Sequence, residues 1–81
     1  MKDSEVQDHI EALVAEEHRL YADAERQGSE TPEDRARLEE IRVQLDRYWD
    51  LLRQRRAQRE FGLDPDTARI RSAETVERYQ Q

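Results

Sequence analysis

Apolar residues recur at alternating steps of four and three along two segments of this 81-residue chain, and this spacing strongly restricts its fold. The first series is apolar except for one acidic member: Val6, Ile10, Leu13, Glu17, Leu20 and Ala24. The second series is apolar throughout: Leu38, Ile41, Leu45, Tyr48 and Leu52. Such a rhythm places each series along one side of an α-helix. The sequence therefore predicts two amphipathic helices that pack through these stripes.

Helix-start and helix-stop residues delimit the two segments. We expect the first helix over residues 4–27 and the second over residues 32–61. Gly28 suits a left-handed cap at the end of the first helix, and Thr31 followed by proline suits the start of the second. A short connection between two long helices makes them antiparallel neighbours. The expected fold is therefore all-α, a long antiparallel hairpin that resembles a coiled coil.

The hairpin should occupy residues 1–62, and residues 63–81 should form a C-terminal tail. A short helix starting near Ser72 would carry Val76 and Tyr79 on one side. So short a helix is marginal alone. The tail is therefore expected either to pack on the hairpin or to be mobile.

The apolar arc of the second helix is too broad for one partner helix, because Trp49 and Leu51 flank its stripe on opposite sides. A chain this small gains only about 3–5 kcal/mol from one core. We therefore expect a homodimer in which two hairpins form a four-helix bundle, with Trp49 within the core.

Charge and composition limit the classes of partner. Charged residues make up 42% of the chain, the net charge is −6, and there is no cysteine. The acidic excess argues against nucleic acid as a partner. No apolar stretch approaches the roughly 18–20 residues needed to span a bilayer, and the N-terminal segment lacks the apolar core of a signal peptide. The expectation is a cytoplasmic protein without a membrane partner.

Four arginines follow the widest part of the apolar face: Arg53, Arg55, Arg56 and Arg59. The second helix is longer than the first, so its arginine segment extends past the N-terminal end of the first helix. Residues of this segment that point inward therefore have no apolar partner on the first helix. Three interpretations stay open. The arginines pair with acidic residues near the N-terminus (Asp3, Glu5, Asp8) or of a second copy, they bind an acidic protein partner, or they bind nucleic-acid phosphate, for which the signal is weak.

The string Glu16-Glu17-His18 suggests a metal site, because carboxylate and imidazole are common ligands. Di-iron bundles use Glu-x-x-His on more than one helix, and neither His9 nor His18 has that spacing. We therefore predict no metal and no cofactor, with Glu16 and His18 solvated and Glu17 paired with Arg42 across the hairpin. A metal- or small-ligand-binding bundle using these histidines and glutamates stays as an alternative.

No catalytic constellation is present in the sequence. There is no nucleophile with a base, no glycine-rich phosphate loop and no evident pair of carboxylates in a pocket. The expected function is that of a non-enzymatic protein–protein interaction module. Its candidate site comprises Trp49 and the Arg53–Arg59 segment.

Two motifs resemble those of a known family. "HIEALVAEEHRL" (9–20) followed by "LDRYWDLLRQRRAQRE" (45–60) resembles a family of short, mostly actinobacterial proteins catalogued as domain of unknown function 2630. The resemblance extends to the "VERYQQ" end. Family members often carry cysteine where this chain has Tyr48, so a thiol has no role at this position here. The resemblance implies a stand-alone cytoplasmic protein and assigns no catalytic residue.

Overall fold

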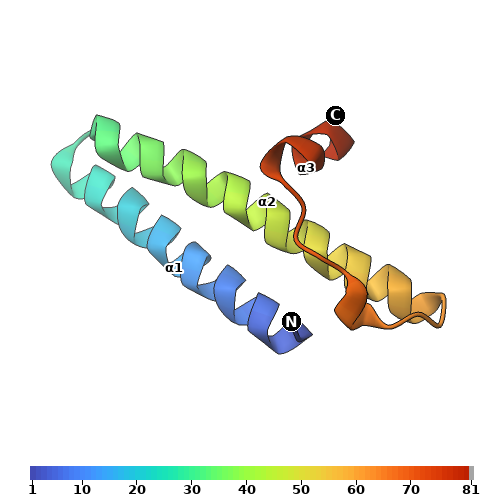
Figure 1. Cartoon of the computed structure of the whole chain (residues 1–81). Helices are drawn as coiled ribbons and strands as arrows, with labels where there is room; N and C mark the ends of the chain where they lie inside the picture. The colour runs from blue at the N-terminus through green and yellow to red at the C-terminus, as the bar shows by residue number, and fades with distance from the viewer. Residues whose placement is uncertain (81) are drawn as a thin grey trace.

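Two long antiparallel helices, α1 (Asp3–Gln27) and α2 (Pro32–Glu60), make up most of the chain (Figure 1). A computed structural model describes residues 1–80, and the side chains of residues 1–78. After α2 come the 3₁₀ turn η1 (Pro65–Thr67) and the short helix α3 (Ala73–Gln80). The described residues contain helices and no strand, which confirms the predicted all-α hairpin with a short C-terminal helix.

The helix ends follow the local chemistry of their capping residues. Gly28 adopts φ 81° after α1, a left-handed conformation that favours glycine. The Thr31 side chain accepts a hydrogen bond from the Asp34 amide at 3.1 Å and begins α2. Beyond α2, Gly62 adopts φ 73° and the Leu63 amide donates to the Gln58 carbonyl at 2.7 Å. The observed ends agree with the predicted ends to within one residue.

The core is small and lies mainly at the open end of the hairpin. The buried apolar residues are Val6, Ile10, Ile41, Leu51 and Val76. Three of them, Val6, Ile10 and Leu51, form one cluster with half-buried neighbours that include Leu45, Tyr48 and Leu52. The two predicted stripes therefore meet, although Leu51, which was expected only to widen the stripe, is among the most deeply buried residues.

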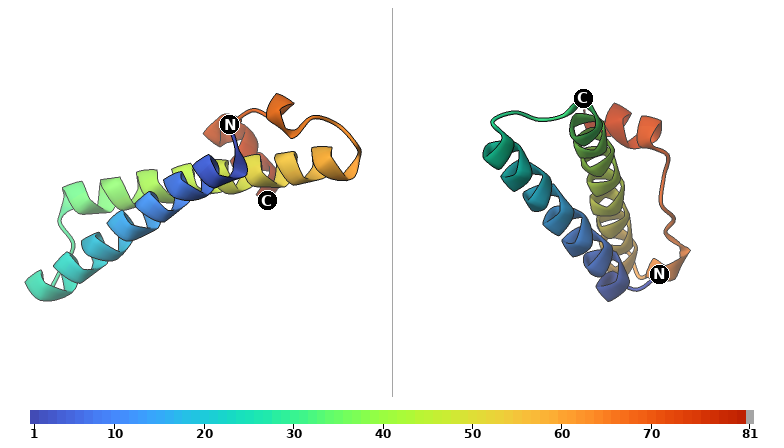
Figure 2. Two further views of the ribbon diagram at one scale, coloured as in Figure 1. Left: turned by 90° about the horizontal axis from the view of Figure 1, so that it is seen from below. Right: turned by 90° about the vertical axis from the view of Figure 1, so that its left-hand side faces the viewer.

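The C-terminal tail is docked on α2. We call residues 61–72 the strap, which runs back along α2 and leads into α3. Figures 1 and 2 show α3 beside α2, on the side away from α1. The three helices thus stand in a row, and the Cα atoms span 51 × 26 × 14 Å. The molecule is a single layer of helices, so much of each broad side of the hairpin lies open.

Val76 holds α3 against this row. Its side chain is 1% exposed, and α3 packs on α2. Ser72 caps the helix by accepting a hydrogen bond from the Thr75 amide at 3.3 Å, which agrees with the predicted start. The side chain of Tyr79, expected on the same side as Val76, lies outside the described residues.

The docking of α3 can be tested by Val76→Asp, which places a carboxylate in an apolar contact. We expect faster amide hydrogen exchange in residues 73–78, because an eight-residue helix without its packing is marginal. Amides in the middle of α1 and α2 should stay protected. Glu74→Gln, at an exposed position of the same helix, is the control. Unchanged exchange in the Val76 variant would show that α3 does not depend on this contact.

Candidate functional site

The predicted arginine segment divides between two sides of α2. Arg55 turns toward the N-terminus of α1 and the strap, and its side chain is only 6% exposed. Arg56 turns away, and its side chain is 78% exposed. Consecutive residues of an α-helix point about 100° apart, which explains how neighbours serve different purposes. The segment therefore comprises a buried ionic anchor and an exposed face.

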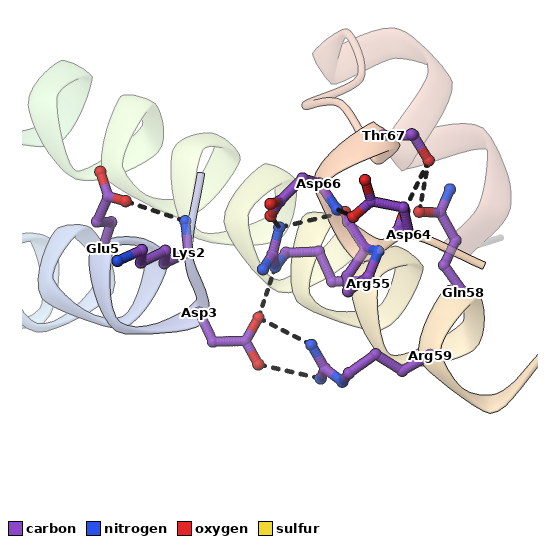
Figure 3. Close-up of polar contacts among 10 residues, drawn as sticks. Lys2, Asp3, Glu5, Arg55, Gln58, Arg59, Asp64, Asp66 and Thr67 are labelled. Atoms are coloured by element: carbon purple, nitrogen blue, oxygen red, sulfur yellow. Dashed lines mark hydrogen bonds and ion pairs between the residues drawn. The ribbon is translucent and has the colours of Figure 1, made fainter. Parts of the chain in front are cut away.

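Arg55 joins three elements (Figure 3). Its Nε donates to Asp3 Oδ1 of α1 at 2.5 Å, and its Nη1 donates to Asp66 Oδ1 at 3.0 Å and to the Pro65 carbonyl at 3.2 Å. Arg59 completes the group, because its Nη2 lies 3.0 Å from Asp3 Oδ2. Of the three interpretations of the arginine segment, pairing with acidic residues near the N-terminus describes Arg55 and Arg59. Asp3 accepts from both. We call these four side chains the Arg55 junction: Asp3, Arg55, Arg59 and Asp66.

Asp3 is the first residue of α1 and does not cap the helix. Lys2 occupies the cap position, and its backbone N–H donates to the Glu5 carboxylate at 3.0 Å (Figure 3). The carboxylate of Asp3 is instead directed to α2 by two guanidinium groups. Glu5, another candidate partner for the arginines, is occupied by this backbone contact.

A second ionic contact fastens the strap further along α2, and sequence reasoning missed it. Asp50 is buried and accepts hydrogen bonds from Arg71 Nε and Gln54 Nε2, each at 2.9 Å. Gln54 also donates to the Arg69 carbonyl at 2.9 Å, and Arg47 Nε donates to the Arg71 carbonyl at 2.9 Å. The signal in the sequence was the acidic residue within the apolar run "WDLL", four residues before Gln54.

Arginine contacts keep the anchoring carboxyls ionised. Hydrogen bonds from Arg55 and then Arg59 lower the pKa of Asp3, and Arg55 lowers the pKa of Asp66. The hydrogen bonds from Arg71 lower the pKa of Asp50 despite its burial. Both ionic contacts between the strap and the hairpin are therefore fully charged at neutral pH.

On the exposed face, Trp49 and three arginines border a shallow groove of about 280 Å³, which we call the Trp49 groove. Its lining consists of Asp3, Gln7, Trp49, Leu52, Arg53, Arg56 and Arg59. In the single chain Trp49 is 48% exposed, so its place in the core of a four-helix bundle stays a prediction that depends on dimerisation. Its strap-side neighbours Asp50 and Leu51 take the covered positions instead.

The Trp49 groove combines apolar area with positive charge. Trp49 and Leu52 supply apolar area, and Arg53 and Arg56 supply exposed positive charge beside it. The described partner of Arg56 is Glu60 at 3.3 Å, a contact between two exposed side chains that contributes little. Tryptophan and arginine are the residue types that most often anchor protein interfaces.

The predicted pair between Glu17 and Arg42 is not formed among the described residues. The ion pair that crosses the hairpin joins Glu16 to Arg37, with Nε–Oε2 and Nη2–Oε1 distances of 2.6 and 2.7 Å. This bidentate contact lowers the pKa of Glu16. Glu16 is therefore paired, and the expectation that it is solvated is wrong. Arg42 binds carboxylates that are nearer to it along α2 or on α3: Glu39, Asp46 and Glu77.

The histidines lie apart from one another. His9 stacks on Tyr48 with ring centroids 5.0 Å apart and planes within 4°, and His18 is exposed. Within residues 1–78, the structure has no group of three or more histidine, aspartate or glutamate side chains that could hold a metal ion. In the same part of the chain, no helix has the length and apolarity needed to cross a membrane.

Removing the central guanidinium tests the Arg55 junction. Arg55→Met should lower the free energy of unfolding by about 2 kcal/mol, because it leaves Asp66 without its cation and Asp3 with only one. The partial exposure of both carboxylates limits this loss. Arg56→Met, with the same change at an exposed position, should change stability by less than about 0.5 kcal/mol. Equal effects in urea unfolding would contradict this assignment.

The same contacts predict acid sensitivity. The pKa values of Asp3, Asp50 and Asp66 are lower in the folded chain, so their stabilisation is complete above the ordinary aspartate value of 3.8. It is lost as the pH falls through their folded values. We expect the free energy of unfolding, measured in urea, to decrease steadily below about pH 4. Asp50→Asn should reduce that decrease, and an unaltered decrease in the variant would refute the role of Asp50.

Comparison with known proteins finds similar chains in mycobacteria. The chain is 48% identical over 77 residues to an uncharacterized protein of Mycobacterium tuberculosis and to one of Mycobacterium bovis. Each alignment covers 95% of this chain and 88% of the relative. No solved structure matches the chain significantly. The model of a family described as protein of unknown function (DUF2630) matches residues 2–81. The chain therefore belongs to the DUF2630 family.

Proposed function

We propose that this protein is a non-enzymatic protein–protein interaction module that docks through the Trp49 groove, and that the partner is a second copy of the chain. The observation that carries the proposal is the half-exposed Trp49, which shares a groove with Leu52 and with arginines of the next turns of α2. An indole left at the surface near guanidinium groups is suited to be covered by a protein that offers apolar side chains and carboxylates.

The amount of exposed surface supports a second copy. The chain exposes 5921 Å², whereas a compact monomer of 9.7 kDa exposes roughly 5,100 Å². A single layer of helices leaves part of each amphipathic surface open, and stable domains are normally built from two layers. Two hairpins stacked through their Trp49 sides would supply the second layer and form a four-helix bundle.

Other functions receive less support from the site. A metal- or small-ligand-binding bundle would need Glu16, which already holds Arg37 through two hydrogen bonds. Nucleic-acid binding would need a wide basic surface, but the exposed arginines adjoin an α1 segment with an acidic excess. Catalysis would need a nucleophile or a free acid–base group, and the groove offers only Asp3, which two arginines occupy.

The lack of cysteine fits the reducing cytoplasm, where we place the module.

Self-association can be measured through Trp49, the chain's single tryptophan. At tens of micromolar, light scattering after size exclusion should give twice the chain mass of 9.7 kDa. Dilution should shift the tryptophan emission to the red as the indole becomes exposed. Trp49→Ala should increase the dimer dissociation constant by roughly tenfold or more, because it removes the central apolar anchor.

Phe61→Ala is the matched control, because Phe61 is an 82% exposed aromatic residue outside the groove. It should leave the dissociation constant unchanged. A wild-type chain that stays monomeric at these concentrations would refute the proposal, and so would an equal loss of association in both variants.

A further inference from the structure

A second groove lies at the other end of the hairpin, at the loop between α1 and α2. We call it the Tyr21 groove. It has a volume of about 480 Å³ and is lined by Tyr21, Ala24, Glu25, Gly28, Ser29 and Glu30. Tyr21 is 49% exposed, much like Trp49 in the first groove. Each end of the hairpin thus presents an exposed aromatic side chain within a shallow groove.

The two grooves are reached from the same side of α1. Gln7 lines the Trp49 groove and Tyr21 lines the other, and these residues lie 14 positions apart. Fourteen residues are just under four helical turns, so the two side chains point within about 40° of one another. Their separation along the helix axis is about 21 Å. One partner lying along this side can therefore reach both grooves.

The grooves carry opposite charges. Arg53, Arg56 and Arg59 line the Trp49 groove on the C-terminal side of Trp49, and Asp3 offsets only part of their charge. Glu25 and Glu30 stand beside Tyr21, and no cationic residue lines that groove, although Glu30 also meets Arg35 at 3.4 Å. The wider segment has the same sign, since residues 16–34 hold seven acidic and two basic groups, a net charge of −5. The linings of the two grooves therefore carry complementary charges.

Two apolar residues lie between the grooves. Val14 lies midway between Gln7 and Tyr21 on α1, and Leu45 lies one heptad before Leu52 on α2. Both side chains are half-buried and contact the core cluster. The exposed Arg42 lies one heptad before Trp49, so it is on this side too. The side therefore has half-buried apolar residues near its middle, a positive aromatic groove at one end and a negative aromatic groove at the other.

We infer that the second copy lies antiparallel on this side, with the two-fold axis near Val14 and Leu45. Each Trp49 groove then receives the acidic loop end of the other copy. A two-fold interface must be self-complementary, and this pattern meets that requirement only when the copies are reversed. A parallel arrangement would place arginines against arginines and glutamates against glutamates, which is repulsive. The inference rests on the proposed function and specifies the orientation and contacts of the partner.

Two charge-reversal variants of the full chain test the orientation. Arg53→Glu with Arg56→Glu makes the open end negative, and Glu25→Arg with Glu30→Arg makes the loop end positive. In the antiparallel dimer, each variant alone meets like charge at both contacts. We expect its dissociation constant to increase by roughly tenfold or more. An equimolar mixture should recover association, because both contacts of the mixed dimer again join opposite charges. Added salt should weaken the wild-type dimer.

Arg69→Glu with Arg78→Glu is the control, because it changes the net charge by the same amount on the strap and α3. Circular dichroism of each variant checks that the helices remain. If the wild-type chain dimerises through Trp49 but neither reversal weakens it, the antiparallel inference is wrong and the proposed function stands. If the wild-type chain is monomeric, both are wrong. Recovery in the mixture, after loss in each variant alone, supports the inference.

Discussion

The Arg55 junction is the contact on which the arrangement of the elements depends. One buried guanidinium binds the first turn of α1 through Asp3 and the strap through Asp66, while its own backbone belongs to α2. Burying an arginine costs free energy unless its donors are satisfied. Here Nε and Nη1 both have acceptors, and the Pro65 carbonyl adds a third contact. The open end of the hairpin and the path of the strap are thereby fixed together.

The Arg55 junction divides the arginine segment 53–59 into paired and exposed side chains. Arg55 and Arg59 are held by Asp3, while Arg53 and Arg56 stay at the surface beside Trp49. Leu51 is buried with Val6 and Ile10 beside the strap, so it does not widen the exposed apolar face that carries Trp49. What remains uncovered on α2 is a narrow apolar strip with guanidinium groups at its end. Under the proposed function, these guanidinium groups would favour a partner that offers carboxylates.

Local sequence signals predicted the helices well, because each depends on residues close in the chain. Gly28 and Gly62 act through their left-handed backbone conformation, and Thr31 acts through a hydrogen bond from an amide three residues later. The ionic partners were harder to predict. Glu16 and Glu17 are adjacent, and the choice of Glu16 by Arg37 depends on a rotation of α1 that the apolar spacing leaves open. Within one chain the buried neighbours are Asp50 and Leu51, and Trp49 stays half-exposed, which the apolar spacing alone does not reveal. The path of the strap depends on Arg71, which donates to Asp50, and on Asp66, which accepts from Arg55. The partners in each pair are distant in the sequence.

The ion pairs that cross the hairpin also imply an order of assembly. Glu16 and Arg37 are separated by 21 residues, whereas Asp3 and Arg55 are separated by 52. Closing the shorter loop costs less chain entropy, so contacts near the turn form more readily than those at the open end. The hairpin should therefore close from the turn outward, with the Asp3–Arg55 contact among the last to form.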